Sequence, residues 1–236
     1  MTWKQLPGLG TDIAIGAEGS AWVIGTNPVQ GGYGIYRWDG GNWIGVDGGA
    51  VRIAVGPDGT PWVVNDAGQI YHRSGSSWQL LPGAAKDIAV GADGTVWVVG
   101  TNPVPGGYGI YKWTGSNWAA VDGGGVRIAV DPHGRPWVLN DTGAIFKRVD
   151  AQPGTPEHWE RIPTGLATDI AISPHGFVWL IGTDNVDGGH GIYYWGGADW
   201  YSVEGGGLAI AADPSDNPWV VNDASVIWEG VGIYPT

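Results

Sequence analysis

Six copies of one sequence pattern constrain the fold of this chain more than any other feature. Each copy joins a short apolar strand, a tight turn and a second strand that contains a tryptophan, as in DIAIGAEGSAWVIG from Asp12. The other copies begin at Arg52, Asp87, Arg127, Asp169 and Leu208. A repeat of about 40 residues with four short alternating strands is typical of a propeller or a solenoid. We therefore expect an all-β protein, a six-bladed β-propeller of four-stranded antiparallel blades.

Twelve of the 16 tryptophans fall at two matched positions of the repeat. One set lies in the second strand pattern of each unit: Trp22, Trp62, Trp97, Trp137, Trp179 and Trp219. The other set opens the fourth: Trp3, Trp43, Trp78, Trp118, Trp159 and Trp200. A large aromatic side chain that every repeat carries is expected to pack each blade on its neighbour, so these twelve are predicted to be structural.

The two ends of the chain predict how the ring closes. The last unit supplies a third strand near Trp228 and then lacks a fourth. The N-terminal segment TWKQLPG from Thr2 aligns with SWQLLPG from Ser77, which is a fourth-strand sequence. We expect the N-terminal strand to complete blade six, which removes an open sheet edge. Residues 1–236 then form a single domain.

Composition and charge exclude several classes of function. The net charge is −12 with only 11 basic residues, whereas nucleic-acid binding requires clustered Lys and Arg. No apolar run is long enough to span a membrane, so we expect no membrane insertion. No basic-then-apolar leader follows Met1, which predicts a cytoplasmic protein, or one secreted without a conventional signal peptide. We expect a monomer. The absence of cysteine excludes disulfides.

A second period divides the six units into three pairs. The odd units carry glycine-rich insertions at 25–34, 100–109 and 182–191, whereas the even units have short Asn-Asp hairpins. These loops should share one face of the propeller, and varied loops are where binding residues are usually found. The candidate ligand-contacting residues there are Tyr33, Tyr108, His190, Asp47, Asp122, Glu204, Asn65, Asp66, Asn140, Asp141, Asn222 and Asp223. For the Asn-Asp pairs, turn formation is the favoured role.

The first strand of each unit begins with alternating charges. Around the ring the residues are Asp12, Arg52, Asp87, Arg127, Asp169 and Ala209. Because a guanidinium can pair with two flanking carboxylates, we expect a ring of ion pairs around the central axis, with Arg127 shared by Asp87 and Asp169. A structural role is favoured over catalysis, and Ala209 leaves a gap that could admit water or a cation.

Three further tryptophans, Trp38, Trp113 and Trp195, end the third strand of the odd units only. They either cover the hairpin or stack on a sugar, because an exposed aromatic face suits the C–H side of a pyranose. Catalysis would need an acid, a base or a nucleophile gathered in one cleft, and the five histidines are scattered. The acidic loops could collect calcium, but no cofactor is required.

The motifs Trp-x-x-Leu-Pro-Gly, as in Trp78–Gly83, and DIAVGADGTVWVV from Asp87 resemble tectonin repeats over essentially the whole chain. The resemblance extends to the lectins of the tachylectin-1, fish-egg-lectin and fungal tectonin group. It implies a six-bladed propeller that recognises surface glycans multivalently in innate defence, including O-methylated sugars or lipopolysaccharide, with no catalysis. The candidate residues above would then bind carbohydrate. Two alternatives remain: a propeller hydrolase or lyase, and a protein-interaction scaffold.

Overall fold

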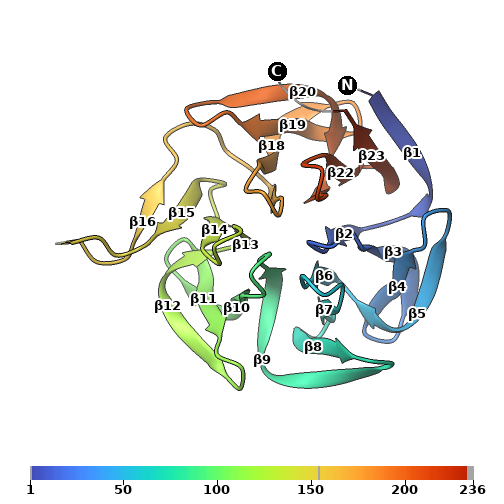
Figure 1. Ribbon diagram of the computed structural model, residues 1–236, viewed down its shortest axis with the longest axis horizontal. Helices are drawn as coiled ribbons and strands as arrows, with labels where there is room; N and C mark the ends of the chain where they lie inside the picture. Colours follow the sequence, from blue (N-terminus) through green and yellow to red (C-terminus); the bar gives the residue numbers. More distant parts are fainter. Residues whose placement is uncertain (1, 154, 233–236) are drawn as a thin grey trace.

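The computed structural model describes residues 2–153 and 155–232, which form an all-β propeller with its sheets arranged around a central axis (Figure 1). The first sheet contains β2 (Asp12–Ile15), β3 (Ala21–Val29), β4 (Gly32–Trp38) and β5 (Trp43–Ala50). The described segments include no helix long and apolar enough to cross a membrane.

The remaining strands form one seven-stranded and three four-stranded sheets. The larger sheet contains β6 (Arg52–Val55), β7 (Pro61–Val64), β8 (Gln69–Ser74), β9 (Ser77–Val90), β10 (Val96–Val104), β11 (Gly107–Trp113) and β12 (Trp118–Gly125). The next contains β13 (Arg127–Val130), β14 (Pro136–Leu139), β15 (Ile145–Val149) and β16 (His158–Arg161). It is followed by β17 (Asp169–Ile172), β18 (Val178–Val186), β19 (Gly189–Trp195) and β20 (Trp200–Gly207). The last contains β21 (Ala209–Ala212), β22 (Pro218–Val221), β23 (Val226–Val231) and β1 (Thr2–Leu9).

Strand β9 belongs to two four-stranded arrangements at once. Its first part, up to Ala84, pairs with β8 as an outer strand, and from Ala85 onward it pairs with β10 as an inner strand. The chain passes from the periphery to the axis without leaving β structure (Figure 1). This continuity joins what would otherwise be two sheets into one.

The N-terminal strand pairs as the sequence predicts. Strand β1 runs antiparallel to β23, with Thr2 opposite Val231 and Gln5 opposite Trp228. Lys4 Nζ lies 2.9 Å from the Glu229 carboxylate across this pair. Figure 1 shows β1 along the outer edge of the last sheet, so the ring is closed by hydrogen bonds between the first and last strands.

The hydrophobic core is divided among the interfaces between neighbouring sheets. Between the last sheet and the first, for example, Leu6 and Ile227 pack in one cluster with Ile13 and Trp219. The tryptophans of the second strands are buried throughout: Trp22, Trp62, Trp97, Trp137, Trp179 and Trp219. The predicted packing role of this set is confirmed.

The tryptophans of the outer strands make a repeated hydrogen bond, which in five cases joins neighbouring sheets and in the sixth joins β12 to β9 within the seven-stranded sheet. The indole N–H of Trp159, for example, donates to the backbone carbonyl of Asp122, 2.8 Å away. Gly123, directly after this carbonyl, has a φ of 96°, a conformation that a side chain would strain. The six donor and acceptor pairs are Trp3–Glu204, Trp43–Pro7, Trp78–Asp47, Trp118–Pro82, Trp159–Asp122 and Trp200–Thr164. We call these six bonds the rim bonds, and they confirm the structural role of this set.

Candidate ligand-binding site

The predicted insertions of the odd units are extended β-hairpins rather than loops. In the first, β3 and β4 continue past a bulge until Val29 pairs with Gly32, which leaves a two-residue turn. The bulge is held by a hydrogen bond from the Tyr36 hydroxyl to Asn27, 2.9 Å long. The equivalent bonds join Tyr111 to Asn102 and Tyr193 to Asp184. These long hairpins therefore present their side chains from regular strands.

The short hairpins of the even units are held by their own asparagines. The Asn65 side-chain oxygen accepts from the backbone N–H groups of Ala67 and Gln69, at 3.1 and 2.8 Å. The next residue, Asp66, donates its backbone N–H to the Gly31 carbonyl at the tip of the long hairpin. The same contacts recur at Asn140 and Asp141, and at Asn222 and Asp223. The asparagines thus form turns, whereas the carboxylates of Asp66, Asp141 and Asp223 are exposed.

Tyr33 and Tyr108 line one shared cavity instead of two separate ones. This central cavity has a volume of about 700 Å³ and lies between the first and second long hairpins, where Asn65 and Asp66 also line it. Its other charged lining residues are Arg52, Lys86 and Arg127. His190, the third residue of the predicted set, is not among the lining residues, and its Nδ1 lies 3.3 Å from the Asp184 carbonyl.

Tyr33, Tyr108 and His190 occupy equivalent positions, but different side chains lie against their rings. Lys86 Nζ lies 4.5 Å from the centroid of the Tyr108 ring, a cation–π contact. The residues that match Lys86 in the other odd units are Thr11 and Thr168, whose hydroxyls donate to backbone carbonyls. Tyr33 therefore has no such cation and is 37% exposed, whereas Tyr108 is half-buried. Sequence reasoning missed Lys86, although comparing the repeats position by position would have found it.

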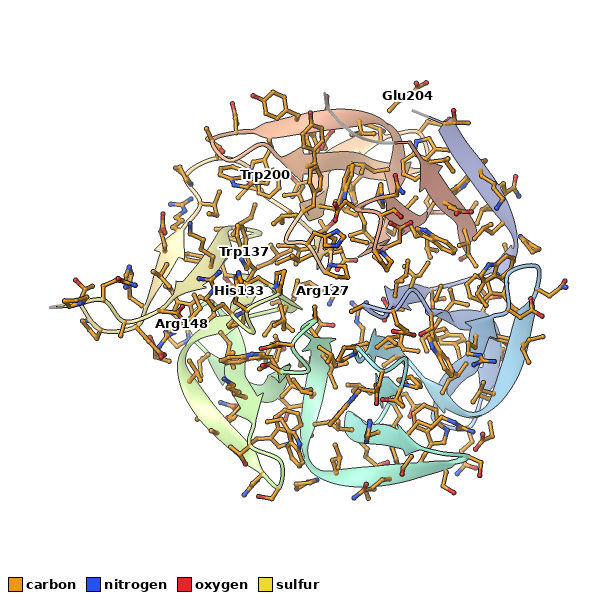
Figure 2. The ribbon with its side chains drawn as sticks, in the orientation of Figure 1. Arg127, His133, Trp137, Arg148, Trp200 and Glu204 are labelled. Carbon is orange, nitrogen blue, oxygen red and sulfur yellow. The ribbon has the colours of Figure 1, made fainter. Side chains whose placement is uncertain are left out.

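Asp47, Asp122 and Glu204 lie at bulges near the periphery, away from the central cavity. In the first, Ile35 pairs with Val46 and Gly34 with Gly49, so Asp47 and Gly48 bulge out of the ladder. All three residues accept rim bonds through their backbone carbonyls. Figure 2 shows Glu204 at the edge of the ring and Arg127 near its axis. The expectation that these acids border the tyrosine pockets is therefore not met.

The side chains of these acids distinguish the three pairs of units. Asp47 lies 2.8 Å from Arg73, whose guanidinium stacks on Trp78. Asp122 contacts Arg148 at 2.7 Å in the same way, with Arg148 over Trp159. At the third acid, Glu204, the rim bond comes from Trp3. The residue opposite Trp3 in the strand pair is Gly230, whereas Arg73 and Arg148 lie opposite Trp78 and Trp159. No arginine therefore stands beside Glu204 at the matching position.

Two recesses with matching walls lie at the junctions between odd and even units. The first has a volume of about 240 Å³ and is lined by Gly48, Gly49, Asn65, Tyr71 and Trp78, among others. The second, about 170 Å³, is lined by the equivalent residues Gly123, Gly124, Asn140, Phe146 and Trp159. We call them the junction recesses. Each combines an indole with backbone that glycines leave uncovered.

Trp38, Trp113 and Trp195 pack on the rim tryptophans opposite them. Trp38 pairs with Trp43 across β4 and β5, with ring centroids 4.9 Å apart. The other two pairs are Trp113 with Trp118 and Trp195 with Trp200, at 4.8 and 4.9 Å. All three are half-buried, which favours the alternative that they cover the hairpin.

The first strands surround a narrow channel of about 100 Å³, which the three aspartates line. One carboxylate oxygen of Asp12 accepts the backbone N–H of Ile53, 2.9 Å away in the next sheet. Asp87 and Asp169 make the same bond to Ile128 and Ile210. The aspartates thus connect neighbouring sheets, which supports the structural role predicted for them.

The ion pairs of the ring differ from the expected alternation. Arg52 lies 3.1 Å from Asp12 and 3.6 Å from Asp87, so it is the shared cation. Arg127 reaches only Asp169, at 3.4 Å. The expectation that Arg127 pairs with both Asp87 and Asp169 is wrong, because the Asp87 oxygen left free by Ile128 is occupied by Arg52.

Burial changes the acidity of this ring. It raises the pKa of Asp87 to about 7, although the Arg52 guanidinium acts in the opposite direction. It also raises the pKa of Asp169 to about 7 and that of Asp12 above its usual value. With three carboxyls and two guanidinium groups, the ring can hold a proton near neutral pH.

The chain matches the model of a known protein family. The model of the tectonin domain matches residues 1–75 and 49–233. The chain belongs to the tectonin family. Tectonin-2 of Physarum polycephalum is 42% identical over 69 residues, which cover 29% of this chain and 18% of that protein. This tectonin chain therefore aligns with less than a fifth of the length of its curated relative.

Solved structures share the propeller fold of this tectonin at low identity. A gluconolactonase of Xanthomonas campestris superposes with a TM-score of 0.69 at 14% identity, covering 95% of this chain and 86% of its own. A streptogramin B lyase gives 0.62 at 14%, covering 97% and 96%. The structure of YCF48 bound to D1 peptide gives 0.56 at 18%, covering 98% and 83%. At these identities the likeness shows the fold alone.

One further polar cluster in this tectonin was not predicted. The Ser173 hydroxyl donates to the Asp216 carboxylate, and His175 Nδ1 lies 3.3 Å from the same group. Asp216 has a φ of 63°, where most of the equivalent turns have glycine. Among residues 2–153 and 155–232, no three His, Asp or Glu side chains are arranged to hold a metal ion.

Proposed function

We propose that this tectonin is a lectin that binds surface glycans at several sites on the face formed by the hairpin tips, without altering them. Family membership supports a lectin-like propeller. The glycans meant are those of foreign surfaces, such as O-methylated sugars or lipopolysaccharide. Several weak sites on one rigid ring would engage a glycan-covered surface together, so that effective concentration raises the overall affinity.

We also propose that the propeller has six blades. The seven-stranded sheet divides at β9, whose outer part completes one blade and whose inner part begins the next. Counted so, each of the six repeats corresponds to one blade. The three pairs of long and short hairpins then give the ring an approximate threefold symmetry, which is what repeated binding sites would require.

The observation that carries the proposal is the recurrence of the junction recess. Two recesses with equivalent linings each combine a tryptophan, glycines and an asparagine. An aromatic wall suits the C–H face of a sugar or a methoxy group, and the polar groups suit hydroxyls. At the third junction Trp228 stands where Tyr71 and Phe146 stand in the others, opposite Val220. A bulkier ring there leaves less room, so we expect the third site to be weaker.

Catalysis is disfavoured by the geometry of the cluster formed by Ser173, His175 and Asp216, which resembles a catalytic triad. In a nucleophilic triad the histidine takes the proton of the serine. Here the Ser173 hydroxyl donates to Asp216, and His175 contacts that same carboxylate. Ser173 is also only 2% exposed. The cluster therefore ties two neighbouring turns together and has no activated nucleophile.

A glycan array followed by titration calorimetry tests the proposal. Tyr71→Trp and Phe146→Trp copy the residue that the third junction already holds, so they should fill a recess without unfolding the protein. Each should remove one binding equivalent for the best array ligand. Tyr201→Trp, at an exposed position on β20, is the matched control and should change nothing.

One result would decide against the lectin, and another would move its binding sites. If no glycan bound and a protein partner were recovered, the scaffold alternative would replace it. If glycans bound with unchanged stoichiometry in both recess variants, the sites would lie elsewhere, and Trp38, Trp113 and Trp195 at the rim would be tested next.

A further inference from the structure

Basic side chains line the central cavity of this strongly acidic protein. Three of the 11 basic residues of the chain, Arg52, Lys86 and Arg127, are lining residues, and Asp66 is the acidic lining residue. Arg52 and Arg127 also pair with the ring carboxylates, so Lys86 supplies the cation that no carboxylate of the lining neutralises. The cavity volume of about 700 Å³ falls within the range of roughly 300–1,000 Å³ usual for small-molecule sites. The cavity adjoins the first junction recess at Asn65, but no basic residue lines either recess.

Lys86 does not make the hydrogen bond that the equivalent residues of the other odd units make. At the matching positions Thr11 and Thr168 donate their hydroxyls to the carbonyls of Gly25 and Gly182, at 3.2 and 3.1 Å. The lysine gives up that bond and places an exposed ammonium group over Tyr108. An ammonium on an aromatic face still has donors directed to solvent, so Lys86 is available to an anion.

Arg127 has unused donors as well. Its Nη1 donates to the Val126 carbonyl at 3.2 Å, and its buried Nε lies 3.4 Å from the Asp169 carboxylate without a hydrogen bond. Arg52, in contrast, is shared by two carboxylates. Because a guanidinium offers five N–H donors, N–H groups at the Nη atoms of Arg127 remain that can donate to an oxyanion.

The aromatic walls indicate the rest of the ligand. The Tyr33 ring is exposed and carries no cation, so it can lie against the apolar face of a sugar ring. Asn65 and Asp66 contribute polar groups on the side of the short hairpin. We propose that the central cavity binds an acidic sugar, whose carboxylate or phosphate is held by Lys86 and Arg127 while Tyr33 packs against the ring.

This inference rests on the proposed function for the sugar ring, whereas the anion site rests on the cavity itself. Calorimetry with glucuronate, glucose 6-phosphate, glucose and inorganic phosphate separates the contributions. Both acidic sugars should bind, glucose should bind at least tenfold more weakly, and added NaCl should weaken the acidic sugars only. The preferred acid then distinguishes a carboxylate ligand from a phosphate ligand.

Lys86→Thr is the decisive variant, since two other repeats hold threonine at this position. It should melt as the wild type does and should bind the acidic sugars at least tenfold more weakly. Lys112→Thr removes an equal charge from the same sheet, from a lysine that lies over Trp97 outside the cavity, and should keep wild-type affinity. The inference is overturned if Lys86→Thr binds glucuronate and glucose 6-phosphate as tightly as the wild type.

Asp66→Asn gives an opposite expected effect that misfolding cannot mimic. It removes the one acid of the lining, so acidic sugars should bind several-fold more tightly while glucose is unaffected. If glycans bind the array but acidic sugars show no preference over glucose, this inference fails and the lectin proposal stands. If inorganic phosphate binds as tightly as glucose 6-phosphate, the sugar part is refuted.

Discussion

The indole Nε1 of Trp159 lies 2.8 Å from the backbone oxygen of Asp122, and this one bond shows how the ring of sheets is held at its periphery. The acceptor belongs to β12 and the donor to β16, so the bond crosses from one sheet to the next. A backbone carbonyl at a bulge has no hydrogen-bond partner in the paired strand, and here the indole N–H donates to it. The rim thus depends on a side chain and a glycine conformation together.

Replacing Trp159 by Phe should therefore lower the free energy of unfolding. The variant keeps an aromatic ring but loses the bond to Asp122, at a cost of about 1 kcal/mol beyond the change in packing. Trp113→Phe is the matched control, because that half-buried indole makes no hydrogen bond within the described structure. Urea unfolding of both proteins measures the difference, and equal losses would show that the rim bond adds nothing.

Gly123→Ala should be costlier than Gly115→Ala. Both glycines have a φ near 95°, so both variants pay the left-handed strain of about 1–2 kcal/mol. A Cβ at Gly123 would also lie 2.8 Å from Trp159 Nε1, whereas a Cβ at Gly115 meets nothing within 4 Å. Gly123→Ala should lose at least about 1 kcal/mol more in the same unfolding assay. An equal loss would refute the close contact at the rim.

A chain that begins at Gly10 lacks β1 and should be greatly destabilised. It would expose the edge of β23 and lose Leu6 from the core between the last and first sheets. Thermal melting followed by circular dichroism measures the loss, and a synthetic peptide of residues 2–9 should restore part of it. Met1 lies outside the described residues. A shortened chain that melts as the parent does would contradict closure by β1.

Stability should fall as the pH rises from about 4 through 7. The folded pKa values of Asp87 and Asp169, about 7, lie above the unfolded value of about 4. The folded state then holds the protons more tightly, so this stabilisation is complete below pH 4 and lost as the pH rises through 7. Each carboxyl contributes up to about 1.4 kcal/mol per pH unit in that window.

Asp169→Asn should flatten this dependence, because the amide cannot ionise and its oxygen can still accept from Ile210. Melting temperatures measured between pH 5 and 8 test it, with the exposed Asp66→Asn as control. A slope in Asp169→Asn as steep as in the wild type would exclude this carboxyl as its source.

The double variant Tyr33→Ala with Tyr108→Ala should remove one binding equivalent for acidic sugars. Two separate sugar sites around these residues would lose two equivalents, but both tyrosines line the same cavity. Calorimetric stoichiometry distinguishes the outcomes. The single variant Tyr33→Ala should weaken binding more than Tyr108→Ala, because Lys86 already covers the second ring.

The repeat predicted the framework because the same contact must recur at every sheet. Trp22 and its equivalents are buried, and the pairing of β1 with β23 follows from matched end sequences. Departures from the regular strand ladder are not specified by the repeat. The sequence predicts Asp47 on the ligand face, yet a bulge within β5 turns its carbonyl to Trp78. Such a bulge depends on the neighbouring sheet, which a single repeat does not specify.

The charge ring shows a second limit of the sequence. Alternating Asp and Arg predicted ion pairing correctly, but which acid shares which arginine depends on where each side chain can reach. Backbone bonds to Ile53 and Ile128 fix one oxygen of Asp12 and Asp87, and the remaining oxygens then select Arg52. The repeat positions alone could not distinguish this choice from its mirror arrangement around Arg127.

The pairing of β1 with β23 has a consequence for biosynthesis. Strand β1 is synthesised well before its partner β23. Its apolar side chains therefore stay exposed until β23 has also been made. Completion of the last sheet depends on a contact between strands separated by most of this sequence. Until that strand pair forms, the edge of β23 is open to pairing with other chains.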